Sequence, residues 1–173
     1  MSAPDRDTAL KDFEGSLVSF VDAYAEVPDE ALAFCKPGED YALGGLVTHA
    51  VAVLEHYQLV LSNLLDAGFE EVRPQDPPGF WEDQTIRAHA GIEPGERAAA
   101  FAELDRRHRE FVAAVSSLPE SDWDRKAPVW FESSAEPLPT SPADIWGWLN
   151  DHYLEHIAQV GQLQAEWEAS RTR

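Results

Sequence analysis

Apolar residues recur at steps of three and four positions through most of this chain, and that period is typical of amphipathic α-helices. The pattern predicts long helices over about residues 6–27, 40–67, 95–118 and 142–170, with a short helical turn over 29–34. Each long helix has an apolar face, so each needs a neighbour that covers it. We therefore expect an all-α protein built as a four-helix bundle.

Residues that start and stop helices mark the predicted ends. Pro28 ends the first helix, and Gly68 is a natural stop for the second. Ser141, Pro142 and Asp144 supply an N-cap, a first-turn proline and a capping-box acid for the last helix. These signals agree with the boundaries that the apolar period predicts.

Two long, proline-rich connections separate the last three helices. They have about 27 and about 23 residues, and the first contains Pro77-Pro78-Gly79. Neither predicts a strand pair, although residues 129–131 suit a short extended piece. Loops this long are often functional, and they are long enough to let the second and third helices lie parallel. The chain length suits a single domain over residues 1–173 with one core.

Two histidines interrupt the apolar stripe of the last predicted helix. His152 and His156 are four residues apart, which is about 6 Å along a helix axis and places both rings on one face. They stand within the series Ile145, Leu149, His152, His156, Val160, Leu163 and Trp167. Burying a polar ring without a partner costs about 1–3 kcal/mol. The pair therefore predicts a partner in the interior, and its spacing suits two ligands of one metal ion.

A third metal ligand has to come from another helix, and His49 on the second predicted helix is the best match in depth. His56 lies two turns from His49, about 10 Å along the axis, so these two cannot bind one ion. We expect His56 and His108, which also lie on apolar faces, to be hydrogen-bonded core groups or to flank the pocket. In the alternative reading all of these histidines are hydrogen-bonded core groups and no metal binds.

Other motifs that carry chemistry are missing from the sequence. It has no His-Glu-x-x-His, no Glu followed three residues later by His, no glycine-rich phosphate-binding motif and no Gly-x-Ser-x-Gly elbow. These absences argue against a zincin protease, a ferritin-like di-iron site, a nucleotide-binding fold and an α/β-hydrolase. The Gly44-Gly45 pair is expected to permit close packing at the start of the second helix.

Charge and cysteine content narrow the class of partners. The net charge of −19 repels phosphate backbones and anionic lipid, so we expect neither nucleic acid nor a membrane as a partner. Cys35 is the only cysteine, which removes the class of secreted proteins framed by disulfides. The first residues lack the apolar segment of a signal peptide, and no apolar run approaches the roughly 18 residues that span a bilayer. We expect a cytoplasmic protein.

The histidine segments carry a family resemblance. Residues 151–160, with the sequence Asp-His-Tyr-Leu-Glu-His-Ile-Ala-Gln-Val, closely resemble the last-helix signature of the DinB-like (YfiT-like) metalloenzyme superfamily. The segment Leu-Val-Thr-His-Ala over residues 46–50 resembles the second-helix ligand segment of that family. The similarity spans nearly the whole chain in helix order and loop lengths. It implies that His49, His152 and His156 are the metal triad.

The resemblance also implies an up-down-down-up bundle and a homodimer. Family members often have Trp-Ser or Trp-Thr before the second helix, where this chain has Tyr41-Ala42. We therefore expect Tyr41 to replace the tryptophan in packing.

Three neutral imidazoles would leave a divalent ion with an open position. A water at such a position reaches a pKa of about 7, and a thiol there is activated as a nucleophile. Members of the family act as metal-dependent hydrolases, or as transferases and isomerases that use low-molecular-weight thiols such as mycothiol or bacillithiol. The resemblance therefore implies a hydrolase or a thiol-dependent S-transferase with a small-molecule substrate. Zinc, nickel and iron all suit imidazole ligands.

Four side chains are candidates for the substrate pocket. Trp148 lies one turn before His152 and is expected at the pocket mouth. Trp81, His89 and Trp130 lie in the long connections and are candidates to close over the metal. The competing function is a non-catalytic stress-response or binding module with a structural metal or none. The two functions differ in coordination, because a structural site is filled whereas a catalytic site keeps an accessible position.

Overall fold

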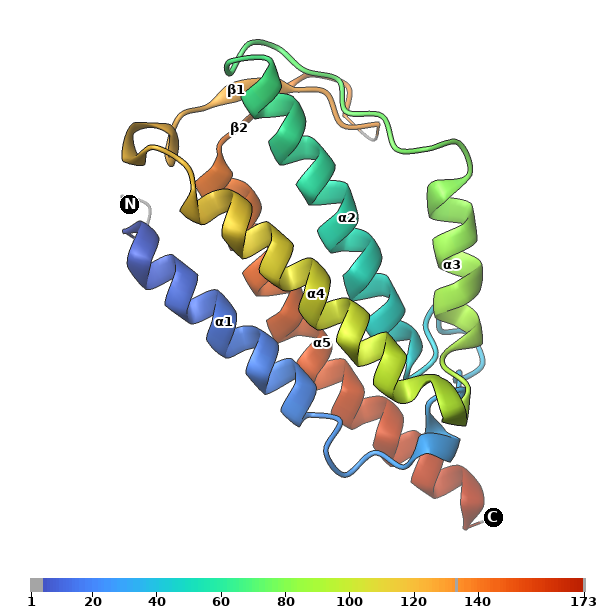
Figure 1. Ribbon diagram of the computed structural model, residues 1–173. Coiled ribbons are helices and arrows are strands. Elements are labelled where there is room, and N and C mark those ends of the chain that lie inside the picture. The colour runs from blue at the N-terminus through green and yellow to red at the C-terminus, as the bar shows by residue number, and fades with distance from the viewer. Residues whose placement is uncertain (1–4, 133, 173) are drawn as a thin grey trace.

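The computed structural model describes residues 5–132 and 134–172, and most of them lie in helices (Figure 1). The helices are α1 (Arg6–Asp22), α2 (Gly45–Asp66), α3 (Phe80–Ala90), α4 (Arg97–Ser116) and α5 (Pro142–Arg171). Three short 3₁₀ turns occupy Asp29–Ala31, Pro94–Glu96 and Glu120–Asp122. Two strands, β1 (Ala127–Val129) and β2 (Leu138–Thr140), form an antiparallel pair. The prediction of a mainly helical protein is therefore confirmed.

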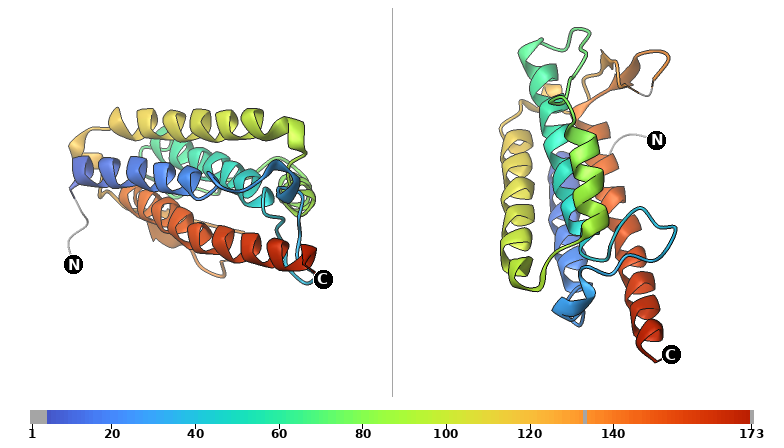
Figure 2. Two further views of the ribbon diagram at one scale, coloured as in Figure 1. Left: turned by 90° about the horizontal axis from the view of Figure 1, so that it is seen from below. Right: turned by 90° about the vertical axis from the view of Figure 1, so that its right-hand side faces the viewer.

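The four long helices pack side by side. Helix α1 contacts α5 and α4, and α2 contacts α4 and α5. Figure 2 shows these four rods lying alongside one another, with the shorter α3 beside one end of α2. In Figure 1, α1 and α5 run from the upper left toward the lower right, whereas α2 and α4 run the opposite way. Helices α2 and α5, which carry His49, His152 and His156, are thus antiparallel neighbours.

The core lies between these four helices and is built from the apolar stripes of the sequence. Phe13 of α1, Leu46 of α2, Leu104 of α4 and Ile145 of α5 are completely buried. Burying a large apolar side chain stabilises the fold by about 1.5–3 kcal/mol. Because each helix buries one continuous stripe, the histidines on those stripes are carried into the interior with their apolar neighbours.

The boundaries of the first two helices differ from the prediction. Helix α1 ends at Asp22 rather than near residue 27, because Tyr24 and Val27 form tight turns in which their N–H groups donate to carbonyls three residues back. Helix α2 begins at Gly45 rather than near residue 40. The N–H of Leu43 donates to the Phe34 carbonyl, so the backbone before α2 pairs with another segment instead of with its own next turn.

Helix α3 corrects the prediction that the first long connection is a loop. It follows Pro77-Pro78-Gly79 and packs against the start of α2. A Cβ built on Gly45 would lie 1.7 Å from the Ala88 carbonyl oxygen, so this crossing requires glycine. The expected close packing at Gly44-Gly45 is therefore confirmed.

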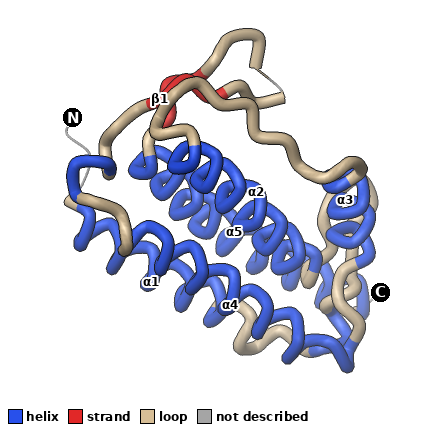
Figure 3. The backbone as a smooth tube through the Cα atoms, turned by 45° about the horizontal axis from the view of Figure 1, so that its top comes forward, coloured by secondary structure: helices blue, strands red, loops and turns tan. Residues whose placement is uncertain are grey.

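The strand pair is a second correction, because neither long connection was predicted to hold one. Pro128 pairs with Pro139 at its centre, and Val129 also bridges to Val72 of the preceding connection. Figure 3 shows the strands among the tan loops at one end of the bundle. The predicted capping box is present: the Ser141 hydroxyl accepts from the Asp144 N–H at 3.2 Å, and the Asp144 carboxylate accepts from the Ser141 N–H at 2.8 Å. In the described part of the chain, no helix has the apolar length that a membrane crossing needs.

Candidate metal centre

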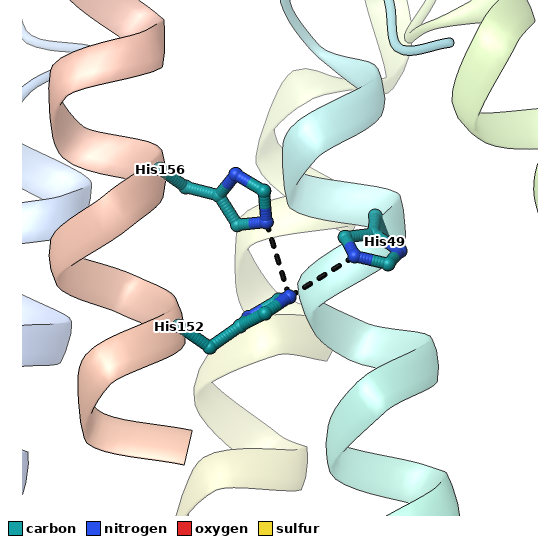
Figure 4. Close-up of side chains that lie close together, drawn as sticks. All are labelled: His49, His152 and His156. Carbon is teal, nitrogen blue, oxygen red and sulfur yellow. Dashed lines mark hydrogen bonds between the residues drawn. The ribbon is translucent and has the colours of Figure 1, made fainter. Parts of the chain in front are cut away.

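Three histidines from two helices meet in the interior. His49 lies in the second turn of α2, and His152 and His156 lie near the middle of α5 (Figure 4). The three residues meet because α2 and α5 are antiparallel neighbours, and the apolar face of each helix, on which the histidines lie, points into the core. His156 is buried, and the other two rings are partly buried. The three residues predicted as a triad are therefore neighbours in space.

The facing ring atoms converge on one point. The Nε2 atom of His152 lies 3.0 Å from Nε2 of His49 and 3.0 Å from Nε2 of His156. One ligand atom from each of the three residues lies within 4.8 Å of the others. No other group of three or more His, Cys, Asp or Glu residues with this closeness occurs among the described residues.

Hydrogen bonds between the rings cannot satisfy this arrangement. A neutral imidazole nitrogen either carries one proton or offers one lone pair, so Nε2 of His152 cannot serve two partners well. A shared cation satisfies all three lone pairs. With metal–nitrogen bonds of about 2.0–2.1 Å, tetrahedral ligands lie about 3.3 Å apart, close to the separations seen here. The three residues therefore fit a divalent ion bound by imidazoles.

Neighbouring groups orient two of the rings. The Nδ1–H of His156 donates to Oε1 of Gln159 at 2.9 Å, which leaves Nε2 of that ring with its lone pair toward the other histidines. The Tyr41 ring stacks on His49 with ring centres 4.5 Å apart, so Tyr41 packs directly against the site, at the position where the resemblance suggested an aromatic substitute. Such supporting contacts are typical of metal-bound histidines.

The electrostatic environment keeps the three rings neutral. Burial, and next the nearby His156 ring, lower the pKa of His49 to about 4. Burial, followed by the rings of His156 and His49, lowers the pKa of His152 to about 3. Burial also lowers the pKa of His156, against the opposing hydrogen bond to Gln159. Neutral imidazoles are the form that binds metal, so the site is ready for a cation at neutral pH.

A cavity of about 690 Å³ opens beside the histidines. It is lined by His49, Val53, His56, Tyr57, Pro74, Asp76, Trp81, Phe131, Glu132, Ser134, Leu138, Trp148 and His152. Helices α2 and α5 supply its floor, and the two long connections with the start of α3 supply the rest of its wall. Two of the three histidines thus face a space large enough for a small molecule.

A histidine–aspartate pair stands in the wall of this cavity. The Nδ1–H of His56 donates to Oδ2 of Asp76 at 2.8 Å, and the indole N–H of Trp81 donates to the same oxygen at 2.9 Å. His56 is therefore both hydrogen-bonded and beside the pocket, within the two roles expected for it. Asp76 was not predicted, because it lies in a proline-rich connection and no local pattern distinguishes it.

The four predicted pocket residues divide into two pairs. Trp148 and Trp81 line the cavity. His89 does not, because it sits in the last turn of α3 with its Nδ1 atom 3.5 Å from Sγ of Cys35. Trp130 does not either: it directly follows β1, and the guanidinium of Arg73 lies over its ring at 4.2 Å. Side chains alternate in an extended segment, so Phe131 rather than Trp130 reaches the cavity.

His108 lies in the core away from this cavity. Its ring stacks on Phe13 with centres 4.2 Å apart, and Nδ1 lies 3.3 Å from the Tyr153 hydroxyl. Burial, opposed next by Asp105, lowers its pKa to about 4. It is a buried core group, as one of the two expectations for it stated.

The fold and the cluster together define the class of helical-bundle proteins with three inward-facing histidines. The sequence model of the DinB superfamily matches residues 12–160. The chain therefore belongs to the DinB superfamily, and the predicted family is confirmed.

Solved structures show the same fold. One is YfiT from Bacillus subtilis, described as "a probable metal-dependent hydrolase with an unusual four-helix bundle topology". It is 16% identical to this chain, the matched region covers 97% of this chain and 90% of YfiT, and the TM-score is 0.74. A mutant of a mycothiol-dependent maleylpyruvate isomerase is 13% identical over 90% of this chain and 60% of its own, with a TM-score of 0.64. A protein from Streptococcus pneumoniae is 11% identical over 98% and 93%, with a TM-score of 0.65. A comparison with curated proteins gives no match.

Proposed function

We propose that this protein is a metal-dependent enzyme in which His49, His152 and His156 hold one divalent ion. The observation that carries the proposal is that Nε2 of His152 lies 3.0 Å from Nε2 of His49 and of His156, beside a cavity of about 690 Å³. The proposal takes residues 1–173 as one domain and the four long helices as an up-down-down-up bundle. The helix directions in Figure 1 support that order.

The chain's own residues would hold the ion and shape the space beside it. The Nε2 atoms supply three neutral ligands, and Gln159 and Tyr41 keep two of the rings in place. Trp148 and Trp81 line the cavity and make its surface partly apolar, which limits the water around a bound substrate. When bound, a divalent ion with three imidazole ligands and an open position would act as a Lewis acid and lower the pKa of a water or thiol at that position.

Two reaction classes agree with this site: hydrolysis, and transfer that depends on a low-molecular-weight thiol. The names of two structural neighbours, a probable metal-dependent hydrolase and a mycothiol-dependent isomerase, support these classes. Zinc, nickel and iron remain equal candidates, because imidazole ligands suit all three. The size of the cavity supports a small molecule as the substrate.

The cavity also favours catalysis over the alternative of a binding module with a structural metal or none. A structural site is closed by its ligands, whereas His49 and His152 here line an open space. The rest of the proposal follows from composition and resemblance: a cytoplasmic homodimer that binds neither nucleic acid nor membranes.

The proposal is tested by loading the purified protein with zinc, nickel or ferrous iron in turn. Each form is assayed for hydrolysis of p-nitrophenyl esters and for transfer of cysteine or glutathione to chlorodinitrobenzene. We expect turnover with at least one metal, loss of it in His152→Ala, and retention in the matched core variant His108→Gln. Equal turnover in the wild type and His152→Ala would show that the triad is not the catalytic centre.

A further inference from the structure

The charged side chains that line the cavity are all acidic. Asp76 and Glu132 are the charged side chains among the described residues that line it, and no lysine or arginine does. The His56–Asp76 pair adds no net positive charge whichever form His56 takes, because the carboxylate balances an imidazolium. A divalent ion on the triad would bring the total charge of the cavity close to zero. One negative ligand atom would therefore be accommodated at the metal, and further negative charges would face carboxylates without a cationic partner.

The remaining wall is largely aromatic. The Trp148 ring lies 5.7 Å from Tyr57 and 6.1 Å from Phe131, measured between ring centres. The Trp81 ring lies 5.3 Å from that of His56 and holds Asp76 through its indole N–H. These rings are only partly buried, and they line the space that a ligand would enter. Aromatic surfaces at such sites favour flat apolar groups, because ring pairs gain attraction beyond simple burial.

We infer that the cavity selects a substrate with a planar apolar group and at most one negative charge, whose ligand atom lies at the triad. This inference rests on the proposed function, because it places one end of the substrate at the metal. His56 offers a polar contact in the same cavity: Asp76 occupies its Nδ1, and Nε2 has no protein partner among the described residues. That nitrogen is positioned to hydrogen-bond a substrate hydroxyl, amide or thiol.

The test is a binding measurement on the cobalt(II)-loaded protein with three thiols as probes: benzyl mercaptan, 2-mercaptoethanol and mercaptosuccinate. Each binds through its sulfur as the thiolate and releases its proton to the buffer, and the sulfur-to-cobalt absorption band reports binding. We expect benzyl mercaptan to bind about tenfold more tightly than 2-mercaptoethanol because of the aromatic wall. Mercaptosuccinate, with two carboxylates, is expected to bind more weakly than either.

Two variants and one control variant separate the aromatic and the charge contributions. Trp148→Ala should remove most of the preference for benzyl mercaptan, whereas Trp167→Ala should keep it, because Trp167 lies on the same helix outside the cavity under the guanidinium of Arg171. Glu132→Lys should strengthen mercaptosuccinate binding several-fold, and by more than it strengthens the binding of benzyl mercaptan, which carries only the thiolate charge. In all three variants the cobalt spectrum without thiol should match the wild type.

The outcomes distinguish this inference from the proposed function. Wild-type protein that binds no cobalt would overturn both. Cobalt binding with equal affinity for the three thiols, or with tightest binding of mercaptosuccinate, would overturn the substrate class and leave the metal site in place.

Discussion

The triad and His108 lie in two regions of the bundle that differ in what their ring nitrogens face. In the triad, three Nε2 atoms from α2 and α5 point at one another beside a cavity. In the core, His108 on α4 stacks on Phe13, and its Nε2 atom is buried without a hydrogen-bond partner in the described structure. Burial lowers the pKa of His49 and of His108 alike, to about 4.

The comparison shows that a buried, neutral histidine is not by itself a site. Both regions meet the condition of a depressed pKa, but only the triad combines it with converging lone pairs and access for a ligand. His108 offers a single lone pair in a packed environment, and a metal needs several ligands. If this distinction holds, changes in the two regions should have separable effects on metal binding and on stability.

The largest difference is expected when a triad ligand is removed. His49→Ala should weaken metal binding by several orders of magnitude, because even supporting residues around metal sites contribute about 10–100-fold. His108→Gln should leave the affinity unchanged. Competition with a chelating dye measures both, and unaltered affinity in His49→Ala would remove that residue from the ligand set.

Metal removal should then destabilise the protein through the triad alone. An ion that binds only the folded state adds about 4 kcal/mol to the free energy of unfolding when its free concentration is about 1,000 times its dissociation constant. Thermal unfolding with and without EDTA should therefore show a clear drop in the midpoint for the wild type and for His108→Gln. A midpoint in His49→Ala that falls equally with EDTA would contradict this assignment.

The core region also contributes to a different observable, the dependence of stability on pH, alongside the metal-free triad, whose rings have lowered pKa values as well. Above pH 6.5 the ring of His108 is neutral in both states; below it the unfolded chain gains a proton, while the folded pKa is about 4. Stability should therefore fall as the pH drops from about 6.5 to about 4, with His108 contributing up to about 3 kcal/mol. Urea unfolding of the metal-free protein should show a shallower decline in His108→Gln. An identical decline in both proteins would refute the contribution.

The smallest effect should come from the group that orients one ligand. Gln159→Leu removes the acceptor of the His156 Nδ1–H and should weaken metal binding about tenfold, which is about 1.4 kcal/mol. Gln162→Leu, at an exposed position three residues along the same helix, is the matched control. Equal affinities of the two variants would mean that the hydrogen bond does not support the site.

The triad residues were predictable because two independent regularities meet there. The apolar period of α5 fixes the inward direction of His152 and His156, and the packing of α2 brings His49 to the same depth. Their neighbourhood follows from helix geometry, which a sequence expresses directly. The supporting aromatic at Tyr41 was also expected, although its stacking on His49 needed coordinates.

The wall of the cavity was harder to predict, because it is built from long connections. Helix α3 buries only Ala88 and leaves Ile86 exposed, so its sequence has no clear apolar stripe. The central pair of the strand ladder is Pro128 opposite Pro139, and proline is usually a signal against strands. The contact of Asp76 with His56 joins residues 20 positions apart, and no local pattern encodes it.

The most direct test of the metal centre is elemental analysis of the purified protein after metal-replete expression, with His152→Ala and His108→Gln purified in parallel. The account predicts about one divalent ion per chain in the wild type and in His108→Gln, and almost none in His152→Ala. A wild-type protein without bound metal, or a His152→Ala variant with as much metal as the wild type, would contradict it.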